Sequence, residues 1–557
     1  MAIDEAEKRE TIEASTDPKY KAAFPTLTEA QIKALEPFGK LRKIPRGEPV
    51  WAAGTPNMCM FVVVEGFMHV LDGRTGAFIA DHQKGGFSGD IDVLSGRPSV
   101  VSAVAASDME VLEVPADCTK SIVAERPELG EIILKAFMTR RALLQEKSGI
   151  GALVVGSRYS PDTLRIREFL ARNRYPFTWE DLEANPMTTK MLKEFHITED
   201  ETPVVVSPTG DVLKVPSNAD LAGCLGMARP IESKIYDLVV IGAGPAGLAA
   251  GVYGASEGLS TLVIDSIGPG GQAGTSSRIE NYMGFPNGLS GQDLADRAVS
   301  QAEKFGAQMI VPAVVENVTC NDSGGHEIMI EGREPISTKC VILATGATYR
   351  KLDVDNNADY EGRGIYYSAT NVERILCNGS SVAVVGAGNS AGQAAVFLAE
   401  KCKHVCLVVR GDDIRKTMSS YLARRIEKSE NITVHLNCEV CGLHGEGHLD
   451  AASVLNRVNK KEVTEQVDGV FVMIGAVPHT DWLPAEVARD EKGFILTGQQ
   501  LIDEGKWKLD RQPFYLETSC QGVFAVGDAR AGSVKRVASA VGEGSMAVAF
   551  VHQFLAM

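Results

Sequence analysis

Two glycine-rich turns have the residue types and spacing of dinucleotide-binding sites. The first, GAGPAG at 242–247, follows the buried-strand pattern YDLVVI and precedes an apolar helix pattern. Gly242 allows a tight turn, Gly244 lets the backbone approach a pyrophosphate, and Gly247 lets the helix pack close to the strand. The free N–H groups of the helix N-terminus favour the phosphate charge, and Asp265 at the end of the next strand is placed to bind a ribose hydroxyl. The predicted site residues of this turn are Gly242, Gly244, Pro245, Ala246, Gly247 and Asp265.

The second turn is GAGNSA at 386–391, where alanine in the last position is an accepted variant. The strand after it ends at Val409 and is followed by Arg410 rather than by an acid, with Arg415 in the same loop. A cation at this position suits the 2′-phosphate of NADP, whereas a carboxylate suits NAD. The alternative is that both arginines are ordinary solvated surface residues. The predicted residues of this second site are Gly386, Gly388, Asn389, Ser390, Ala391, Arg410 and Arg415.

The elements that must position these turns repeat within the chain. Residues 236–265 and 381–410 both follow the order strand, glycine turn, helix, strand, which predicts two dinucleotide-binding lobes. Upstream, short β-like runs between glycines at 25–116 favour a small β-barrel or sandwich, and 127–147 has helical spacing. Residues 150–227 alternate strands with helices at 163–172, 188–195 and 217–226, which indicates a small α/β domain.

Bulk properties exclude several function classes. A chain of 557 residues is too long for one core and predicts several domains. The net charge of −16 argues against general binding to nucleic acid or to anionic membranes. The charged N-terminal segment predicts no secretory signal, and no apolar run is long enough to predict a transmembrane helix. The 11 cysteines, an odd number, favour a reducing cytoplasmic location over a disulfide framework.

Residues 236–557 resemble the low-molecular-weight thioredoxin reductase family of flavoproteins. The motifs that carry the resemblance occur in family order: GAGPAG, GGQAGTSSRIENYMGFP (270–286), ILATGATYR (342–350), GAGNSA, VDGVFVMIGAVP (467–478) and GVFAVGD (522–528). The resemblance implies FAD in a lobe formed by 234–352 and 483–557, NADPH in an inserted lobe at 353–482, and a homodimer. It also implies hinge connections near 347–353 and 479–484. Further cofactor positions implied by the resemblance are Gly271, Gln272, Asn281, Thr345, Gly346, Gly527, Asp528, Arg536, Val537 and Ala538.

The chain departs from this family at the redox-active dithiol. The stretch that aligns with the family's Cys-x-x-Cys is Ser368-Ala369-Thr370-Asn371, so both thiols are replaced. A serine hydroxyl is not a redox thiolate, and asparagine forms no disulfide. We therefore expect no catalytic residue of the usual kind and no internal disulfide step.

The two N-terminal units carry resemblances of their own. Residues 25–148, preceded by an arm at 1–24, resemble a cyclic-nucleotide-binding β-roll in which Asp90 stands for the usual glutamate. Ser99 occupies the position of the phosphate-binding arginine, and Arg97 is close but displaced, so cyclic-nucleotide binding is not expected. Residues 149–227 resemble a thioredoxin or glutaredoxin fold with Ser160-Pro161-Asp162-Thr163 in place of the dithiol. A cis bond is expected at Thr202-Pro203.

One other cysteine pair deserves comparison with a metal or redox site. Cys438 and Cys441 lie near His444 and His448, but the pattern ITVHLNCEVCGL predicts one strand, on which residues three apart face opposite sides. We therefore expect no metal, and we expect Cys402 and Cys406 to be packing thiols.

The fold predicted from these patterns and resemblances is multidomain: a β-roll, a thioredoxin-like α/β domain and two Rossmann-like three-layer lobes for FAD and NAD(P). The predicted function is NADPH-dependent flavin oxidoreduction, with hydride passing from NADPH to FAD and on to an unknown acceptor that includes partner proteins among its candidates. Two alternatives stay open. One is a redox- or nucleotide-responsive sensor or scaffold with little turnover, and the other is a disulfide reductase that uses non-standard cysteines.

Overall fold

The computed structural model describes residues 17–146, 149–184, 197–231, 235–276, 278–321, 325–354, 356–361, 363–367, 369 and 371–557. These residues form two compact units. The first contains the chain up to Gly156 together with Phe169–Pro230 and Glu303–Phe305. The second contains Ser157–Glu168, Ile231–Ala302 and Gly306–Met557.

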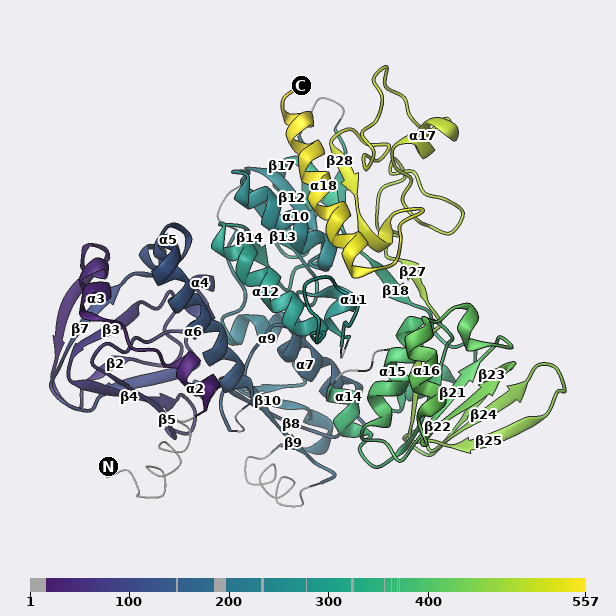
Figure 1. The fold of residues 1–557 in the computed structure, drawn as a ribbon, viewed down its shortest axis with the longest axis horizontal. Coiled ribbons are helices and arrows are strands. Elements are labelled where there is room, and N and C mark those ends of the chain that lie inside the picture. Colours follow the sequence, from purple (N-terminus) through teal and green to yellow (C-terminus); the bar gives the residue numbers. More distant parts are fainter. Residues whose placement is uncertain are drawn as a thin grey trace. The chain divides into compact units, whose positions relative to one another are not determined.

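The first unit begins with an antiparallel β-roll, drawn in purple and blue in Figure 1. One sheet has the order β1 (Lys40–Ile44), β7 (Met109–Val114), β3 (Met60–Glu65). The other has the order β2 (Pro49–Trp51), β6 (Val101–Ala105), β4 (Phe67–Asp72), β5 (Phe78–Gln83). The helices of this part are α2 (Pro18–Ala23), α3 (Glu29–Leu35), α4 (Ile91–Ser95), α5 (Ala116–Glu125) and α6 (Pro127–Glu146).

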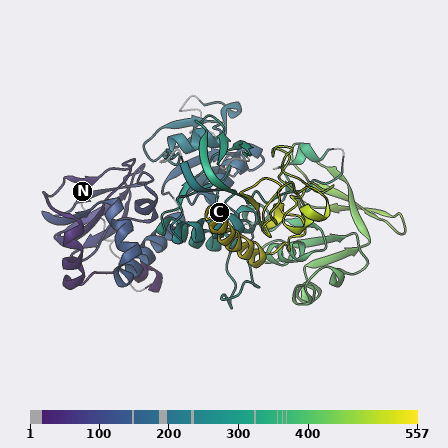
Figure 2. The same cartoon turned by 90° about the horizontal axis from the view of Figure 1, so that it is seen from above.

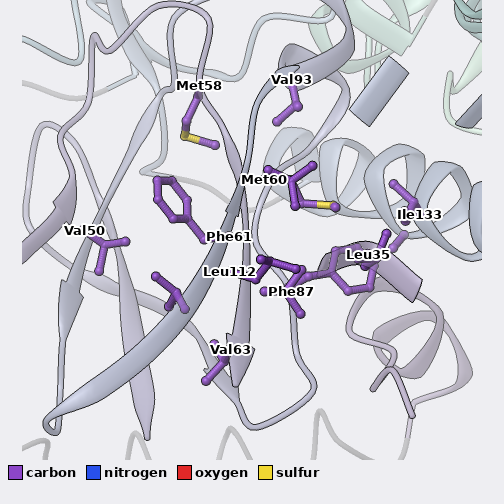
Figure 3. Close-up of a cluster of buried hydrophobic side chains, with 14 of the residues drawn as sticks. Leu35, Val50, Met58, Met60, Phe61, Val63, Phe87, Val93, Leu112 and Ile133 are labelled. Carbon is purple, nitrogen blue, oxygen red and sulfur yellow. The ribbon is translucent and has the colours of Figure 1, made fainter. Parts of the chain in front are cut away.

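The core of the β-roll lies between its strands and helix α6. Met60 and Leu112 from the sheet meet Phe87 and the α6 residue Ile133, as Figure 3 shows. Helix α6 forms where helical spacing predicts it, because Leu129, Ile133 and Phe137 recur on its buried face. Helix α2 packs against α6, so the β-roll's contacts extend upstream to residues 18–23.

The second part of the first unit is a four-stranded sheet of order β11 (Val212–Lys214), β10 (Val204–Val206), β8 (Ala152–Gly156), β9 (Phe177–Asp181). Strands β8 and β9 are parallel, and β10 is antiparallel to both of its neighbours. Helix α9 (Asn218–Cys224) belongs to this part, whereas helix α7 (Pro161–Arg172) is divided, with its residues up to Glu168 in the second unit and those from Phe169 in the first. The Thr202–Pro203 bond is cis, which confirms the prediction, whereas the helix predicted at 188–195 lies outside the described residues.

The second unit contains a seven-stranded sheet that carries the first glycine turn. Its order is β14 (Gln308–Ile310), β13 (Thr261–Ile264), β12 (Ile235–Ile241), β17 (Ile336–Leu343), β16 (His326–Ile330), β15 (Val315–Thr319), and β28 (Val523–Ala525) also pairs with β17. The helices are α10 (Pro245–Ser256), α11 (Gly271–Gly274), α12 (Gly291–Lys304), α17 (Gln499–Asp503) and α18 (Val537–Leu555). Helices α10 and α18 lie side by side, and α18 (yellow) runs to the C-terminus in both views (Figure 1, Figure 2).

A second, five-stranded parallel sheet carries the other glycine turn, as the sequence repeat predicts. Its order is β19 (Ile365–Tyr366), β26 (Gly469–Val472), β20 (Ser381–Val385), β21 (His404–Val409), β22 (Ile432–Leu436). An antiparallel sheet follows: β23 (Cys438–His444), β24 (Ala451–Asn456), β25 (Glu462–Gln466). The helices are α13 (Asn357–Tyr360), α14 (Asn371–Leu376), α15 (Asn389–Ala399) and α16 (Ser420–Lys428).

The two chain segments that connect these lobes pair with each other. Strand β18 (Ala347–Tyr349) runs antiparallel to β27 (Ala476–Pro478) and forms a separate two-stranded ribbon. Gly346 and Gly475, at the ends of the ribbon, have φ of +67° and +96°. The chain therefore enters and leaves the five-stranded lobe at one place.

The prediction of a single strand over ITVHLNCEVCGL is wrong. Asn437 has φ of +57° and separates β22 from β23, which belong to different sheets. Asparagine tolerates this left-handed conformation better than most residues, and the alternation of apolar side chains does not reveal the break.

Candidate functional site

The first glycine turn leaves open space where the sequence predicts a pyrophosphate. Gly242 has φ of +106°, and a Cβ there would lie 2.3 Å from the Ala344 carbonyl oxygen. A Cβ on Gly247 would lie 1.8 Å from the Gly242 oxygen, so helix α10 packs too close to the turn for a side chain. Gly244 differs, because its Cβ would approach only the Gly271 Cα, at 3.9 Å. The open space therefore faces the N-terminus of α10.

Segments distant in sequence converge on this turn. A Cβ on Gly271 would lie 3.0 Å from the Gly244 Cα, and one on Gly527 would lie 3.1 Å from the Ala246 Cβ. The Thr345 backbone nitrogen lies 3.1 Å from the Cβ position of Gly242. Among the described residues, the buried Thr345 hydroxyl has no hydrogen-bond partner, as expected for a group that meets a bound molecule. The structure thus brings together most of the predicted FAD positions.

Asp265 and Asn281 are placed differently from these residues. One Asp265 carboxylate oxygen accepts from the Ala243 N–H at 2.8 Å, and the other accepts from the Ile267 and Gly268 N–H groups at 3.0 Å. Asp265 therefore also holds the turn in shape. Asn281 is exposed in the loop between α11 and α12, and the Gln272 amide nitrogen donates to the Ala347 carbonyl oxygen beside the ribbon.

Glu543, on helix α18, is a residue that the sequence analysis missed. One of its carboxylate oxygens accepts from the Gly527 N–H at 2.7 Å, and both form hydrogen bonds with the Arg530 guanidinium. This buried pair holds the Gly527–Asp528 loop against α10. Burial raises the pKa of Asp528, and the Lys535 ammonium donates to the Asp528 carbonyl oxygen at 2.6 Å. A lone glutamate in the apolar stretch VASAVGEGSMAVAF is the sequence signal for Glu543.

The remaining predicted residues of this site lie at the start of α18. Arg536 is the N-cap residue of this helix, and Val537 and Ala538 begin its first turn. Arg536 and Ala538 are exposed. The Arg536 N–H donates to the Val534 carbonyl oxygen at 2.7 Å, so the backbone N–H groups at the start of the helix that are not needed for the turn before it are those of Val537 and Ala538.

The second glycine turn repeats the geometry of the first. Gly386 has φ of +143°, and a Cβ there would lie 2.3 Å from the Met473 carbonyl oxygen. A Cβ on Gly388 would meet nothing within 4 Å, so the space before helix α15 is open. The Asn389 side-chain oxygen accepts from the Ser419 N–H at 2.7 Å. Ser390 is exposed on the first turn of α15, and Ala391 is buried against the sheet.

Arg410 and Arg415 follow strand β21 with their side chains 60% and 59% exposed. The Arg410 Nε lies 3.4 Å from a Glu439 carboxylate oxygen, and an Arg415 Nη2 lies 2.6 Å from one of Glu427. Exposed ion pairs of this kind contribute only about 0–1 kcal/mol. Both guanidinium groups can therefore exchange a carboxylate for a phosphate at little cost.

The position of the missing dithiol is only partly described. Ser368 and Thr370 lie outside the described residues, and Asn371 is the first residue of α14. None of the 11 cysteines, all of which lie in the described ranges, forms a disulfide. Burial raises the pKa of Cys402 to about 11 and that of Cys406 to about 12, as expected of packing thiols.

Cys438 and Cys441 occupy opposite sides of strand β23. Cys438 is buried and Cys441 is exposed, and an irregularity in the pairing with β24 lies between Val440 and Gly442. His444 is bonded to Ser453 through its Nε2, at 2.9 Å. The predicted opposite orientation of the two thiols is confirmed.

A different set of potential metal ligands was missed by the sequence analysis. Cys406, His435 and Glu465 come from β21, β22 and β25, and their ligand atoms lie within 4.8 Å of one another. The His435 ring and the Glu465 carboxylate are 3.4 Å apart. Burial and Glu465 raise the pKa of Cys406 to about 12, so a neutral thiol lies beside the His435 ring and the Glu465 carboxylate.

In the β-roll, the residues considered for binding a cyclic nucleotide form hydrogen bonds or ion pairs with other groups of the chain. Asp90 caps α4 through the Asp92 N–H and lies 2.8 Å from the buried Arg141 guanidinium. Arg97 is half-buried and donates to the Asn173 carbonyl oxygen at 2.7 Å, outside the β-roll. The Ser99 hydroxyl donates to the Val101 carbonyl oxygen at 2.8 Å.

At the start of helix α7, the Ser160 hydroxyl accepts from the Thr163 N–H at 3.3 Å. Ser160 therefore starts helix α7, which begins at Pro161, and Asp162 pairs with Arg165 at 2.9 Å.

Comparisons with known proteins identify two families and several relatives. A family model described as pyridine nucleotide-disulphide oxidoreductase matches residues 236–544, and one described as cyclic nucleotide-binding domain matches residues 41–126. The thioredoxin reductase of Bacillus subtilis (strain 168) is 32% identical over 325 residues, covering 58% of this chain and 96% of that protein. A 34.2 kDa protein in the rubredoxin operon of Clostridium pasteurianum is 31% identical over 325 residues, covering 58% and 98%.

Two solved structures of thioredoxin reductases are also similar to this chain. The crystal structure of T. acidophilum thioredoxin reductase matches with a TM-score of 0.53 and 28% identity, covering 58% of this chain and all of that one. That of Lactococcus lactis thioredoxin reductase matches with a TM-score of 0.52 and 26% identity, covering 58% and 99%. Within the described ranges, no helix has the length and apolar character needed to cross a membrane.

Proposed function

Because this chain belongs to the pyridine nucleotide-disulphide oxidoreductase family, we propose that it passes electrons from NADPH through FAD to an external acceptor without an internal dithiol. The chain is an NADPH-dependent flavin oxidoreductase. When bound, FAD supplies the hydride-accepting and electron-donating chemistry. The observation that carries the proposal is the pair of glycine turns. A Cβ on Gly388 would meet nothing within 4 Å and one on Gly244 only the Gly271 Cα, at 3.9 Å, whereas a Cβ on Gly242 or Gly386 would lie 2.3 Å from a backbone oxygen.

The residues of the chain hold and orient the two cofactors. FAD would be held by the α10 N-terminus, Gly271, the Thr345 hydroxyl and the Gly527–Asp528 loop. Glu543 keeps that loop in place. The α15 N-terminus would hold the NADPH pyrophosphate, with Arg410 and Arg415 as candidates for its 2′-phosphate.

The absence of the dithiol determines where the electrons go. In the aligned stretch, Ser368 and Asn371 stand where the family resemblance implies thiols. Cys438 and Cys441 are the single pair at Cys-x-x-Cys spacing in the sequence, and they lie on opposite sides of a strand. Residues oriented in this way do not form a disulfide with each other. Both observations support an acceptor outside this chain's own cysteines.

The ribbon of β18 and β27 supports a rotation of the NADPH lobe between two working positions. The Arg350 N–H donates to Gly475 at 3.0 Å and the His479 N–H donates to Gly346 at 3.2 Å, so the two connections are linked at both ends. Glycines with positive φ at these ends can absorb backbone rotation.

For residues 149–227 we propose a thioredoxin-like docking module without redox chemistry. The strand order, with parallel β8 and β9 and antiparallel β10, supports this. Ser160 and Thr163 at the start of α7 offer hydroxyl groups where a redox fold needs thiols.

Anaerobic stopped-flow reduction of the purified flavoprotein tests the proposed function. We expect NADPH to bleach the flavin faster than NADH does, and we expect reoxidation by a quinone or ferricyanide. We also expect a Cys438→Ser, Cys441→Ser double variant to behave like the unmodified chain. Flavin that NADPH does not reduce would overturn the oxidoreductase assignment. Acceptor reduction that disappears in the double variant would instead assign the electron exit to these cysteines.

A second candidate function is a ligand-responsive regulator with little turnover, and the cavity in the β-roll favours it. This function predicts that flavin reduction or reoxidation changes when the cavity is filled.

A further inference from the structure

The β-roll contains a cavity of about 680 Å³, a volume typical of sites for small organic molecules. It lies between the strands of the second sheet, helix α6 and helix α2. Aromatic side chains dominate its wall, from Tyr20, Phe24, Trp51 and Phe78. Aliphatic side chains such as Met58, Val70, Leu143 and Ile150 complete the apolar lining.

One cation at the cavity wall has no anionic partner bonded to it. Arg140 is 6% exposed, and its guanidinium donates to the carbonyl oxygens of Ala23 and Gly89, each at 2.7 Å. Its Nη2 has no hydrogen-bond partner in the part of the chain that the structure describes. The guanidinium also lies over the Phe24 and Phe87 rings, at 5.2 and 4.7 Å. A buried, incompletely bonded cation is costly unless an anion reaches it.

None of the other titratable groups at the wall is hydrogen-bonded to Arg140 in the part of the chain that the structure describes. Burial and Arg140 lower the pKa of His82 well below its usual value, so this ring is neutral at pH 7. The Asp90 carboxylate is paired with Arg141, which also pairs with Asp92, and the Glu146 carboxylate is 2.6 Å from the Lys19 ammonium. Asp90 attracts Arg140 through space, but the Arg140 Nη2 is left for a carboxylate that enters the cavity.

A cyclic nucleotide does not match this arrangement. The Asp90 carboxylate, at the position expected to bind a ribose, is paired with Arg141. Arg97 donates a hydrogen bond to Asn173, and Ser99 carries no charge that could bind a phosphate. The cation lies instead on helix α6, among aromatic rings.

We propose that the β-roll cavity binds an apolar organic carboxylate, with its carboxylate on the Arg140 guanidinium and its apolar body against the aromatic wall. A planar guanidinium suits a carboxylate, and one cation suits one negative charge. Tyr20 of helix α2 and Phe24, which caps its C-terminus, line the wall, and the Ala23 oxygen of α2 accepts a hydrogen bond from Arg140. A ligand on Arg140 therefore contacts a helix as well as the sheet.

Fluorescence titration of the full-length flavoprotein tests this with 11-(dansylamino)undecanoic acid and its carboxamide. The two probes differ only in the charge of the head group. Because a hydrogen bond to a charged group contributes about 1.5–3 kcal/mol, we expect the acid to bind about 10- to 100-fold more tightly. We expect cAMP and cGMP not to displace it.

The matched variants are Arg140→Met and Arg126→Met. Arg126 lies over the Phe38 ring at 5.5 Å in the same domain but does not line the cavity. We expect only Arg140→Met to weaken the acid, to the level of the amide. Equal affinity for acid and amide, no saturable binding of the acid, or displacement by cAMP would overturn the proposal. If Arg140→Met does not fold, the acid–amide comparison on the unmodified chain decides alone.

Discussion

The substitution Gly388→Ala should weaken NADPH binding without changing the stability of the fold. Gly388 has φ of −83° and ψ of 179°, a backbone conformation that alanine adopts without strain. A Cβ at this position meets no protein atom within 4 Å. The methyl group would instead occupy the space before α15 in which the NADPH pyrophosphate is proposed to lie.

Two small terms set the effect on stability. Gly388 is the N-cap residue of α15, where alanine is worse than glycine by about 0.5–1 kcal/mol. Alanine also lowers the entropy of the unfolded chain, which stabilises the fold by about 0.4–1 kcal/mol. The two contributions have opposite signs, so we expect the free energy of unfolding to change by no more than about 0.5 kcal/mol.

The effect on NADPH binding is larger. If the methyl group displaces the pyrophosphate from one charge-assisted hydrogen bond, the loss is about 1.5–3 kcal/mol. This corresponds to about 10- to 100-fold weaker binding. The assay is the anaerobic rate of flavin reduction as a function of NADPH concentration, with thermal unfolding measured on the same preparation.

Two glycines serve as controls. Gly386→Ala introduces a Cβ 2.3 Å from the Met473 oxygen at a positive φ, so it should lower thermal stability itself. Gly223→Ala places a methyl group in open space on α9 and belongs to neither turn, so it should raise stability by up to about 1 kcal/mol and leave the NADPH dependence unchanged. An NADPH dependence that Gly388→Ala leaves unchanged, in a stably folded variant, would refute the assignment of this space to the pyrophosphate.

Further predictions concern charge. Arg415→Gln should raise the KM for NADPH about 10-fold and leave that for NADH unchanged, because only NADPH carries the 2′-phosphate; an equal change in both contradicts the assignment. Glu543→Gln leaves the buried Arg530 without a charged partner and should destabilise the FAD lobe by about 3 kcal/mol. The measurement is the urea midpoint of flavin release, with the exposed Glu400→Gln as control; coincident midpoints for Glu543→Gln and the unmodified chain argue against the loop-holding role. His82 has a lowered pKa in the folded state, so the unfolded chain binds its proton first and stability falls as pH drops below about 6.5. His82→Gln should therefore show a smaller loss of Tm between pH 7.5 and pH 5.5 than the unmodified chain, and an equal loss would show that His82 contributes nothing.

The dinucleotide turns were predictable because their physical requirements are local. The tight turn at Gly242 and the helix packing at Gly247 follow from glycine spacing alone, and the structure has backbone oxygens where a Cβ would be. The same holds for helix α6, whose buried residues recur at helical spacing.

Contacts between distant segments were not predictable from spacing. The bond from Gly527 to Glu543 requires α18 to fold back onto α10, and no periodicity encodes that return. The surroundings of Arg140 were not predictable either. The sequence shows a charged residue within an apolar helix, but it does not show that the Phe24 ring lies beside it. The break at Asn437 went unnoticed because strand alternation continues on both sides of it.

The β18–β27 ribbon makes the five-stranded lobe a removable insert. Tyr349 is opposite Ala476 in the ribbon. The chain therefore leaves the seven-stranded lobe and re-enters it at two points that are only one strand spacing apart. Joining these two positions with a short turn would close the seven-stranded lobe over a gap that a hairpin spans, at little entropic cost. The flavin-binding lobe can therefore exchange one nucleotide-binding lobe for another, during evolution or in the laboratory, without altering its own strand order.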